Sequence, residues 1–264
     1  MQDYLTVCER AARAGGRVLL DWQGRIHAKE KAPKDLVTEA DLASQRTIQA
    51  ILQETFPDHD FLGEEEDNQQ IAAERRSEFR WIVDPLDGTA NYVHQLQTFA
   101  VSIALEQRGD VLVGVIYDPV LDQCFSACRG GGAFMNGQRL HVSRRQRLAS
   151  ALVAASLPAN VQRNSAEIKR LVEVLVECQA LRRLGSAALN LAYLASGRLD
   201  GYWATNVKIW DVAAGILLVR EAGGIVTGLD GGAFDLARPR FAAAATRGLH
   251  TELLSALGRG ANRP

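Results

Sequence analysis

The stretch WIVDPLDGTAN, at residues 81–91, decides what this chain can form. An apolar strand leads into two aspartates, Asp84 and Asp87, that lie three residues apart. Pro85 has no amide hydrogen, so we expect it to end the hydrogen bonding of the strand and to let both carboxylates converge, with the carbonyl of Leu86 left unpaired. Two carboxylates and a free carbonyl suit a hard divalent cation, above all Mg²⁺.

Two interpretations of this stretch are open from its residues alone. Gly88 and Thr89 offer unencumbered backbone N–H groups where a helix can begin, and that geometry holds a phosphate beside the cation. Asp-Pro and Asp-Gly are also common turn formers, so the stretch is equally compatible with a plain turn. Other acidic residues of the chain favour the metal site.

A second acidic cluster follows a short apolar run. Glu64 is nearest to this run and is preceded by Gly63, which allows close approach, so Glu64 is the member of the cluster that we expect to reach a metal. Glu66 and Asp67 are better explained as part of a solvated acidic loop.

Two further aspartates are ambiguous. Asp211 stands at the start of an apolar helix rich in small residues, where it is an N-cap and also able to point at a ligand beyond the helix. Asp41 could merely close the capping box that begins at Thr38.

The spacing of apolar residues predicts a strand-rich first half and a second half in which strands and helices alternate. The predicted helices span residues 5–22, 38–56, 165–178, 187–196 and 211–221, and the predicted strands span residues 79–83, 99–105, 111–117, 181–184 and 199–203. Tight turns are expected at residues 108–110 and 136–137. An arginine-rich segment, residues 143–147, marks a soft boundary between an N-terminal α+β domain (1–146) and a C-terminal α/β domain (147–264).

Composition excludes several classes of partner. The 264 residues are 47% hydrophobic, and 30 Lys and Arg against 31 Asp and Glu give a net charge of −1, so no basic field attracts nucleic acid or a membrane surface. Apolar runs fall far short of the ~20 residues of a membrane span, and no secretory signal is visible. Four cysteines without a CxxC pair are expected to be buried or incidental thiols in a reducing compartment, which predicts a cytoplasmic protein.

Together these segments closely resemble the inositol monophosphatase family. The resemblance rests on residues 63–65, 81–94 and 210–215, in that order and spacing, and extends to residues 35–41, 185–188 and 221–224. It implies a layered αβαβα sandwich of the α+β or α/β class, of the inositol monophosphatase and fructose-bisphosphatase type, commonly a homodimer. It also implies a hydrolase that cleaves phosphate monoesters with two to three Mg²⁺ ions and is inhibited by Li⁺.

The resemblance assigns roles to individual residues. Glu64, Asp84 and the Leu86 carbonyl would bind one Mg²⁺, while Asp84, Asp87 and Asp211 would bind the second. Thr89, oriented by Asp41, would help to activate the attacking water, so the implied catalytic residues are Asp41, Glu64 and Thr89. The residues implied to bind substrate are Leu86, Asp87, Gly88, Thr89, Gly185, Ser186, Ala187, Ala204 and Asp211.

One position departs from the family pattern. Inositol monophosphatases usually carry a glutamate seven residues before Asp211, where it binds a ring hydroxyl of the substrate, and this chain has Ala204 there. Losing that acceptor weakens discrimination between polyols, although Asn206 is a possible substitute. His94 and Trp210 are expected to be structural residues that face the core.

The expected activity is therefore hydrolysis of a small polyol or sugar phosphate, with inositol 1-phosphate as the default substrate. Related substrates stay open, namely histidinol phosphate, 3′-phosphoadenosine 5′-phosphate and fructose bisphosphate. A regulatory protein of the same fold, acting through transcription or RNA-processing partners, is the alternative of a different class. A nucleotide-binding domain is disfavoured because the chain lacks a GxxxxGK[ST] loop.

Overall fold

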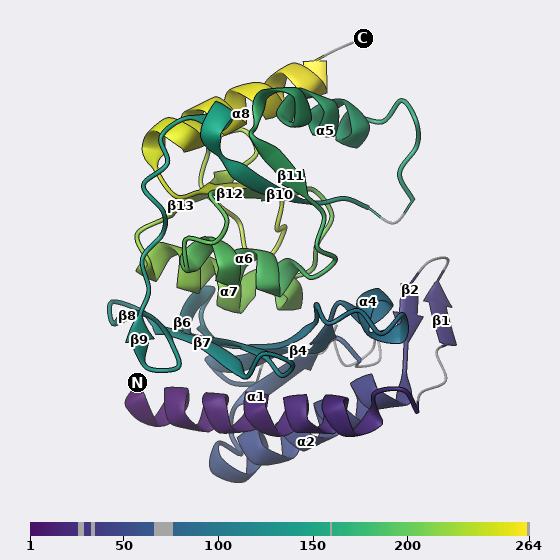
Figure 1. The fold of residues 1–264 in the computed structure, drawn as a ribbon. Coiled ribbons are helices and arrows are strands. Elements are labelled where there is room, and N and C mark those ends of the chain that lie inside the picture. The colour runs from purple at the N-terminus through teal and green to yellow at the C-terminus, as the bar shows by residue number, and fades with distance from the viewer. Residues whose placement is uncertain (26–28, 33–34, 66–75, 159, 263–264) are drawn as a thin grey trace.

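Five layers, alternating helix and sheet, make up the chain (Figure 1). The computed structural model describes residues 1–25, 29–32, 35–65, 76–158 and 160–262. One outer layer holds α1 (Gln2–Trp22) and α2 (Glu39–Thr55), the middle layer holds α6 (Ala187–Ala195) and α7 (Ile209–Glu221), and the other outer layer holds α5 (Ala166–Glu177) and α8 (Arg247–Asn262). A sheet separates each pair of helical layers, which confirms the predicted αβαβα sandwich.

The first sheet has seven strands in the order β3-β4-β5-β6-β7-β8-β9. Their bounds are Asp60–Gly63, Phe79–Asp87, Ala100–Gln107, Asp110–Asp118, Gln123–Cys128, Gly132–Met135 and Gln138–Arg139. Only β3 and β4 run parallel to each other; the remaining neighbours are antiparallel. Because parallel strands end at the same edge, the residues that follow β3 lie beside the end of β4.

Strand β4 is longer than the sequence predicts, and the expectation that Pro85 ends its hydrogen bonding is wrong. Asp84 lies opposite Ser102 of β5, and pairing resumes with Asp87 opposite Ala100 after a shift in register. The missing amide of Pro85 falls inside this irregularity, where a bulge leaves residues unpaired in any case. The strand therefore carries both aspartates on one continuous element.

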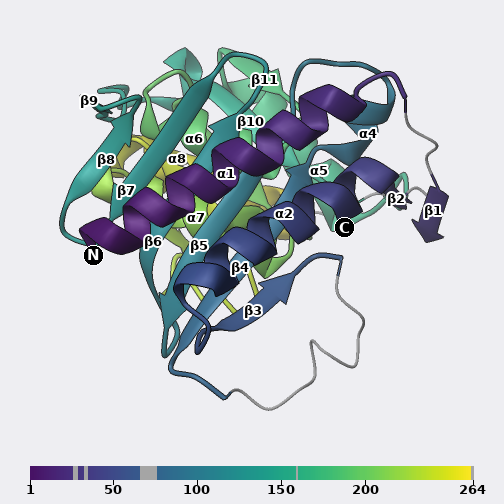
Figure 2. The ribbon, with the colours of Figure 1, turned by 90° about the horizontal axis from the view of Figure 1, so that it is seen from below.

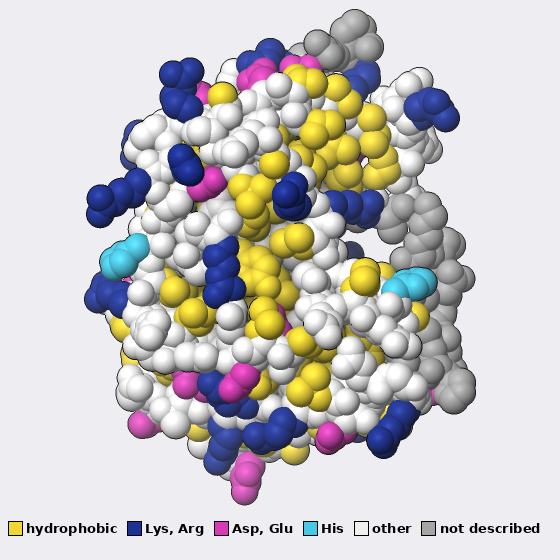
Figure 3. Space-filling model, in the orientation of Figure 1, with side chains coloured by type: hydrophobic (Ala, Val, Ile, Leu, Met, Phe, Trp, Pro, Cys, Tyr) yellow, Lys and Arg dark blue, Asp and Glu magenta, His cyan; other side chains and the backbone are white. Residues whose placement is uncertain are grey.

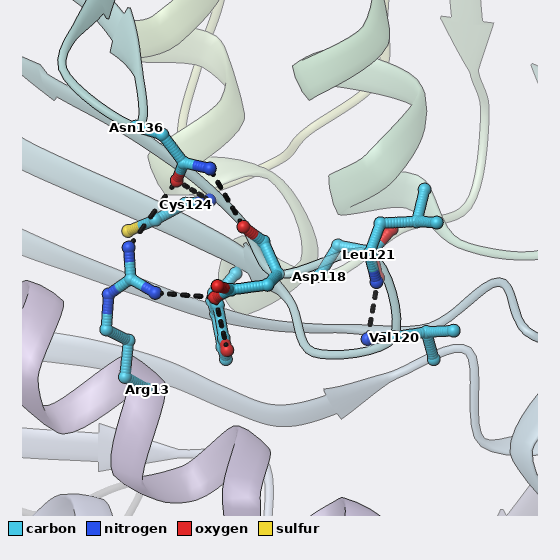
Figure 4. Close-up of polar contacts among 8 residues, drawn as sticks. Arg13, Asp118, Val120, Leu121, Cys124 and Asn136 are labelled. Atoms are coloured by element: carbon cyan, nitrogen blue, oxygen red, sulfur yellow. Dashed lines mark hydrogen bonds and ion pairs between the residues drawn. The ribbon is translucent and has the colours of Figure 1, made fainter.

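Helices α1 and α2 cover the outer face of this sheet. Seen from below in Figure 2, α1 crosses β5, β6 and β7, and α2 lies along β4. Arg13 of α1 donates to Asp122 at 2.7 Å and to the side-chain oxygen Oδ1 of Asn136 at 3.4 Å (Figure 4), so α1 is held to the turns at the far end of the sheet. The predicted tight turn is confirmed at Asn136 and Gly137, which have positive φ angles of 47° and 80°.

The second sheet has five strands in the order β11-β10-β12-β14-β13. Their bounds are Ala180–Arg182, Leu152–Ser156, Gly201–Ala204, Phe241–Ala244 and Ile225–Gly228. Strand β10 is parallel to both β11 and β12, so the partly parallel second half is confirmed. A short hairpin of β1 (Lys29–Ala32) and β2 (Asp35–Val37), the helix α4 (Thr89–Val93) and a 3₁₀ turn (Leu148–Ser150) complete the described elements.

The middle layer belongs to the cores of both sheets. Helix α6 is buried along nearly its whole length, and one hydrophobic cluster joins α6 and α7 to residues of the seven-stranded and the five-stranded sheet. The division at residues 146 and 147 stays a prediction, although the two sheets separate between β9 and β10.

Two surface features bear on partners. Apolar side chains gather on the outer face over α5 (Figure 3), where Val172, Leu175 and Val176 are exposed. The helix periodicity predicts Val172 and Leu175 on one face with Ile168 and Leu171. None of the helices in the described ranges has the length and apolar character needed to cross a membrane.

The close contact between β6 and α7 yields a stability prediction. A Cβ added at Gly114 would lie 2.8 Å from Cα and 2.9 Å from O of Ala214, both backbone atoms that cannot turn aside. We expect Gly114→Ala to lower the free energy of unfolding by about 1–3 kcal/mol, measured by chemical denaturation. Gly258→Ala is the control, because no heavy atom lies within 4 Å of its added Cβ; this helical substitution should raise stability by roughly 0.5–1 kcal/mol. Equal stability of Gly114→Ala and the parent chain would contradict the packing described here.

Candidate active site

Glu64 and Asp84 meet where the parallel strands β3 and β4 end. Gly63 lies opposite Val83 in the register, and the Glu64 amide donates to the Val83 carbonyl at 3.1 Å, so Glu64 continues the pairing as far as Asp84. Asp84 is 1% exposed and shares a side-chain hydrogen bond with Glu64.

The glycine before Glu64 leaves room for the Gln45 side chain on α2. A Cβ at Gly63 would lie 2.4 Å from Oε1 of Gln45, and the same oxygen accepts the amide hydrogen of Glu65 at 3.0 Å. Gln45 approaches Gly63 closely, while the expected approach of Glu64 to a metal stays a prediction. The Gln45 side chain fixes the backbone that carries Glu64.

Asp87 lies against the first turn of α6. Its carboxylate accepts the hydroxyl hydrogen of Ser186, the amide hydrogen of Ala188 at 2.7 Å and that of Ala187 at 3.2 Å. Burial raises the pKa of Asp87 to about 6, and the three hydrogen bonds oppose this rise because they favour the charged form. The helix terminus also offers a favourable dipole for the anion.

Asp211 completes the acidic group from the start of α7. Its Oδ2 accepts the amide hydrogen of Lys208 at 2.8 Å; Lys208 is the N-cap, so Asp211 closes the first turn from the third helical position and not as the expected N-cap. Burial, Asp87 and Glu64 raise its pKa, while burial, Glu64, Asp87 and Asp211 raise that of Asp84. These mutual effects place the four carboxyl groups in one neighbourhood, although they come from three separate parts of the sequence.

Asp41 closes the capping box of α2 and also lies within hydrogen-bond distance of Thr89. Its Oδ2 accepts from the Thr38 amide at 2.9 Å and from the Thr38 hydroxyl, which closes the capping box of α2, while its Oδ1 lies 3.4 Å from the Thr89 hydroxyl. The Thr89 hydroxyl is also 3.1 Å from the Leu86 carbonyl. The expectation that the Leu86 carbonyl is unpaired is therefore wrong, although its second lone pair stays available.

The donor chemistry fits a hard divalent cation. Four carboxyl groups and a carbonyl offer oxygen ligands alone, which Mg²⁺ prefers. Across the described ranges, no three His, Cys, Asp or Glu side chains already surround a point closely enough to hold an ion, because these carboxylates are turned toward backbone amides. A cation would offset the charge of the neighbouring carboxylates, which together with burial raises the pKa of Asp84.

The residues implied to bind substrate are placed unevenly. Ser186 and Ala187 lie at the start of α6 against Asp87, with Gly185 just before them. Ala204 is fully buried at the end of β12, opposite Ser156 and Phe241, and offers no hydrogen-bond acceptor from its side chain.

Several other sequence expectations can be compared with the structure. His94 is exposed and Trp210 only half-buried, so the expectation that both face the core is wrong for His94; it follows the last turn of α4, where the chain leaves the surface of the sheet. Cys8 and Cys124 are buried free thiols, as expected, and burial raises the pKa of Cys124 to about 12. Glu66 and Asp67 lie outside the described residues.

Sequence reasoning missed the neutral side chains that hold the site together. Ser44 of α2 donates to the Pro85 carbonyl at 3.1 Å, and Ser102 of β5 donates to the Trp210 carbonyl at 3.2 Å. Asn91 donates to two carbonyl groups. Only Asn91 carried a signal, since it lies within the central motif; serines on a helix and a strand have none.

Comparison with known proteins identifies the family. The model of the inositol monophosphatase family matches residues 1–260. The chain belongs to this family. It is 44% identical to an inositol-1-monophosphatase of Mesorhizobium japonicum over 86% of each chain, and 39% identical to the Nus factor SuhB of Pasteurella multocida over 94% of this chain and 93% of the relative. The crystal structure of the extragenic suppressor protein SuhB from Bartonella henselae superposes with a TM-score of 0.89 at 41% identity, covering 97% of this chain and 98% of that one.

Membership in the inositol monophosphatase family supports a phosphatase activity, and the family is generally metal-dependent. The two names carried by these relatives leave the exact activity and the substrate open. The residue roles assigned from the sequence stay predictions.

The raised pKa values predict an unusual dependence of stability on pH. A carboxyl group whose pKa is raised in the folded state, like Asp87 from 3.8 to about 6, stabilises the fold below its unfolded pKa, and this contribution is lost as the pH rises through the folded pKa. Without metal, the free energy of unfolding should therefore fall between pH 5 and pH 7.5. Asp84→Asn should be more stable than the parent at pH 7.5, on the order of 1–3 kcal/mol, in chemical denaturation with a chelator present.

Asp122→Asn provides the control for this measurement. Hydrogen bonds from Tyr117 and Arg13 lower the pKa of Asp122, so removing its charge should give no gain in stability at pH 7.5. A parent chain whose stability rises steadily from pH 5 to pH 7.5, unaffected by Asp84→Asn, would contradict the electrostatics of the site.

Proposed function

We propose that this protein hydrolyses phosphate monoesters of small polyols or sugars with Mg²⁺, and that inositol 1-phosphate is its first candidate substrate. One observation carries the proposal: Glu64, Asp84, Asp87 and Asp211 gather in one neighbourhood, next to a hydroxyl that is hydrogen-bonded to the buried Asp41. This arrangement joins a cation site to Asp41, which can accept a proton from water by way of the Thr89 hydroxyl.

Thr89 and Asp41 are the residues that we propose to act on the attacking water. When the Thr89 hydroxyl hydrogen points at Asp41 or at the Leu86 carbonyl, lone pairs of its oxygen are free to accept a hydrogen from that water. The water oxygen then forms the new bond to phosphorus as the ester bond breaks; one proton of this water passes by way of the Thr89 hydroxyl to Asp41, and the leaving alkoxide takes up a proton from solvent water, so that alcohol and inorganic phosphate are formed. Residues 88 and 89, at the start of α4, have backbone N–H groups that no helical partner uses, and these would bind the phosphate oxygens.

Bound Mg²⁺ would polarise the phosphate, lower the pKa of the attacking water and neutralise charge on the leaving oxygen. Glu64, Asp84 and the Leu86 carbonyl would hold one ion, and Asp84, Asp87 and Asp211 the second, with a third ion reached from Glu64. The division of ligands follows the family resemblance and is supported by the shared position of Asp84 between the other carboxyl groups.

The substrate is proposed only by class. The name of the Mesorhizobium japonicum relative, inositol-1-monophosphatase, supports inositol 1-phosphate. Ala204 weighs against strict selectivity, since a buried alanine cannot hydrogen-bond a ring hydroxyl. Histidinol phosphate, 3′-phosphoadenosine 5′-phosphate and fructose bisphosphate therefore belong in the test panel.

Three further properties are proposals of the same kind. The resemblance supports inhibition by Li⁺ and a homodimer, and the sequence composition supports a cytoplasmic location without a membrane or nucleic-acid partner. Light scattering after size-exclusion chromatography tests the dimer, and a Li⁺ titration of the activity tests inhibition.

A regulatory function is the second candidate, and the names of two relatives favour it. The Pasteurella multocida relative is called a Nus factor and the Bartonella henselae relative an extragenic suppressor protein. Recovery of polymerase or ribosomal components on the tagged protein at physiological salt would support this function. The retained acidic group supports an enzyme in either case, because a regulator that acts by contacts alone has no use for buried, mutually repelling carboxylates.

Substitutions at Thr89 test the proposed chemistry. Thr89→Val keeps the size of the side chain but removes the hydroxyl, and we expect kcat on the best substrate to fall about 10²- to 10⁴-fold. Thr89→Ser is the matched control that keeps the hydroxyl, and it should retain most of the activity. The measurement is phosphate release across the substrate panel with Mg²⁺ and with a chelator.

The proposed function is wrong if the parent protein releases no phosphate from any of these esters with Mg²⁺ present. Equal rates for Thr89→Val and Thr89→Ser would remove Thr89 from the mechanism but leave the metal site in place.

A further inference from the structure

Asn91 joins three segments around the acidic group. Its Nδ2 donates to the Thr98 carbonyl at 2.7 Å and to the Leu184 carbonyl at 2.8 Å. Thr98 lies in the segment that leads into β5, and Leu184 lies in the segment that leads into α6. The side-chain amide of Asn91 therefore donates both of its hydrogens to backbone carbonyl groups. One of these, the carbonyl of Leu184, belongs to the second half of the chain.

The backbone at Gly185 is shaped to this amide. Gly185 has a positive φ of 86°, and a Cβ there would lie 2.7 Å from Nδ2 and 2.8 Å from Oδ1 of Asn91. Gly88, with a φ of 99°, would meet the Thr98 carbonyl at 2.9 Å and the Gly185 carbonyl at 3.4 Å if it carried a Cβ. Both glycines let the turn at residues 87–91 and the segment before α6 touch directly.

A second connection runs between the same two segments. Ser186 caps α6 by accepting from the Leu189 amide at 3.1 Å, and its hydroxyl donates to Asp87. Asp87 and Asn91 lie on one turn, and Leu184 and Ser186 lie on one segment. The α6 terminus is thus held at two points, by a carboxylate that accepts and by an amide that donates, and it cannot rotate without breaking both.

We propose that Asn91 is a positioning residue that sets the start of α6 against Asp87 and thereby fixes Asp87 as a Mg²⁺ ligand. The inference rests on the proposed function, in which Asp87 binds Mg²⁺. Asn91 itself touches neither ion nor substrate in this scheme. Without its two hydrogen bonds, the segment around Leu184 is free to move and Asp87 loses the defined direction that its three donors impose.

Calorimetric titration with Mg²⁺ alone, without substrate, tests this assignment. We expect Asn91→Ala to weaken Mg²⁺ binding by about 10-fold or more, as is typical when a partner of a metal ligand is lost. The increase in Tm produced by saturating Mg²⁺ should shrink in parallel.

Asn136→Ala is the matched control, since Asn136 also donates from Nδ2 to a backbone carbonyl, that of Asp122 at 2.9 Å. It follows β8, four strands away from β4, or roughly 19 Å at the usual spacing. Its loss should lower the Tm of the metal-free protein but leave the affinity for Mg²⁺ unchanged.

Two outcomes would overturn the assignment. Asn91→Ala that binds Mg²⁺ like the parent while losing Tm would show that Asn91 only stabilises the fold. If Asn91→Ala does not fold, Gly185→Ala is titrated in its place, because its Cβ forces the same two segments apart while Asn91 is retained. An unchanged Mg²⁺ affinity of Gly185→Ala also overturns the assignment. A parent chain that binds Mg²⁺ but hydrolyses none of the esters contradicts the proposed function and leaves the assignment of Asn91 standing.

Discussion

Repulsion between buried carboxyl groups is the constraint on which the rest of this structure depends. Asp84 and Asp87 are buried and Glu64 and Asp211 are half-buried; burial and neighbouring carboxylates raise the pKa values of Asp84 and Asp211, and burial raises that of Asp87. The chain keeps them in place with backbone amides: each aspartate accepts from the N–H of a turn or a helix start. These donors fix the directions of the three aspartates, and a bound cation would neutralise the charge of the acidic group.

Neutral side chains supply the rigidity that this arrangement needs. Ser44, Asn91 and Ser102 each donate to a backbone carbonyl of another segment, and each of those segments carries either a residue of the acidic group or the donors that hold Asp87. These hydrogen bonds add no further negative charge to the acidic group, whose carboxylates already repel one another. The near-zero net charge of the whole chain thus conceals an uneven distribution of charge, because the described ion pairs, such as Arg80 with Glu106, lie outside the acidic group.

The acidic residues could be found from the sequence because their chemistry is local. A strand that ends in two aspartates, an acidic N-cap and a glutamate after glycine are each visible within a few residues, and the five layers followed from the family resemblance. What the sequence could not give was the course of β4 through Pro85, since whether a proline ends a strand depends on the partner strand and its register. Strands β10 and β14 were seen only as apolar runs, because a short run cannot be told from a buried helix segment.

The shared middle layer has a consequence for how the chain is made. The seven-stranded sheet is complete in sequence at Arg139, yet the helices that cover its inner face end at Glu221. At the usual rate of ribosomal synthesis this face waits about 4–16 s for its cover. If the first sheet forms as it leaves the ribosome, its inner apolar face would stay exposed for seconds, before the residues of α6 and α7 that cover it have been made.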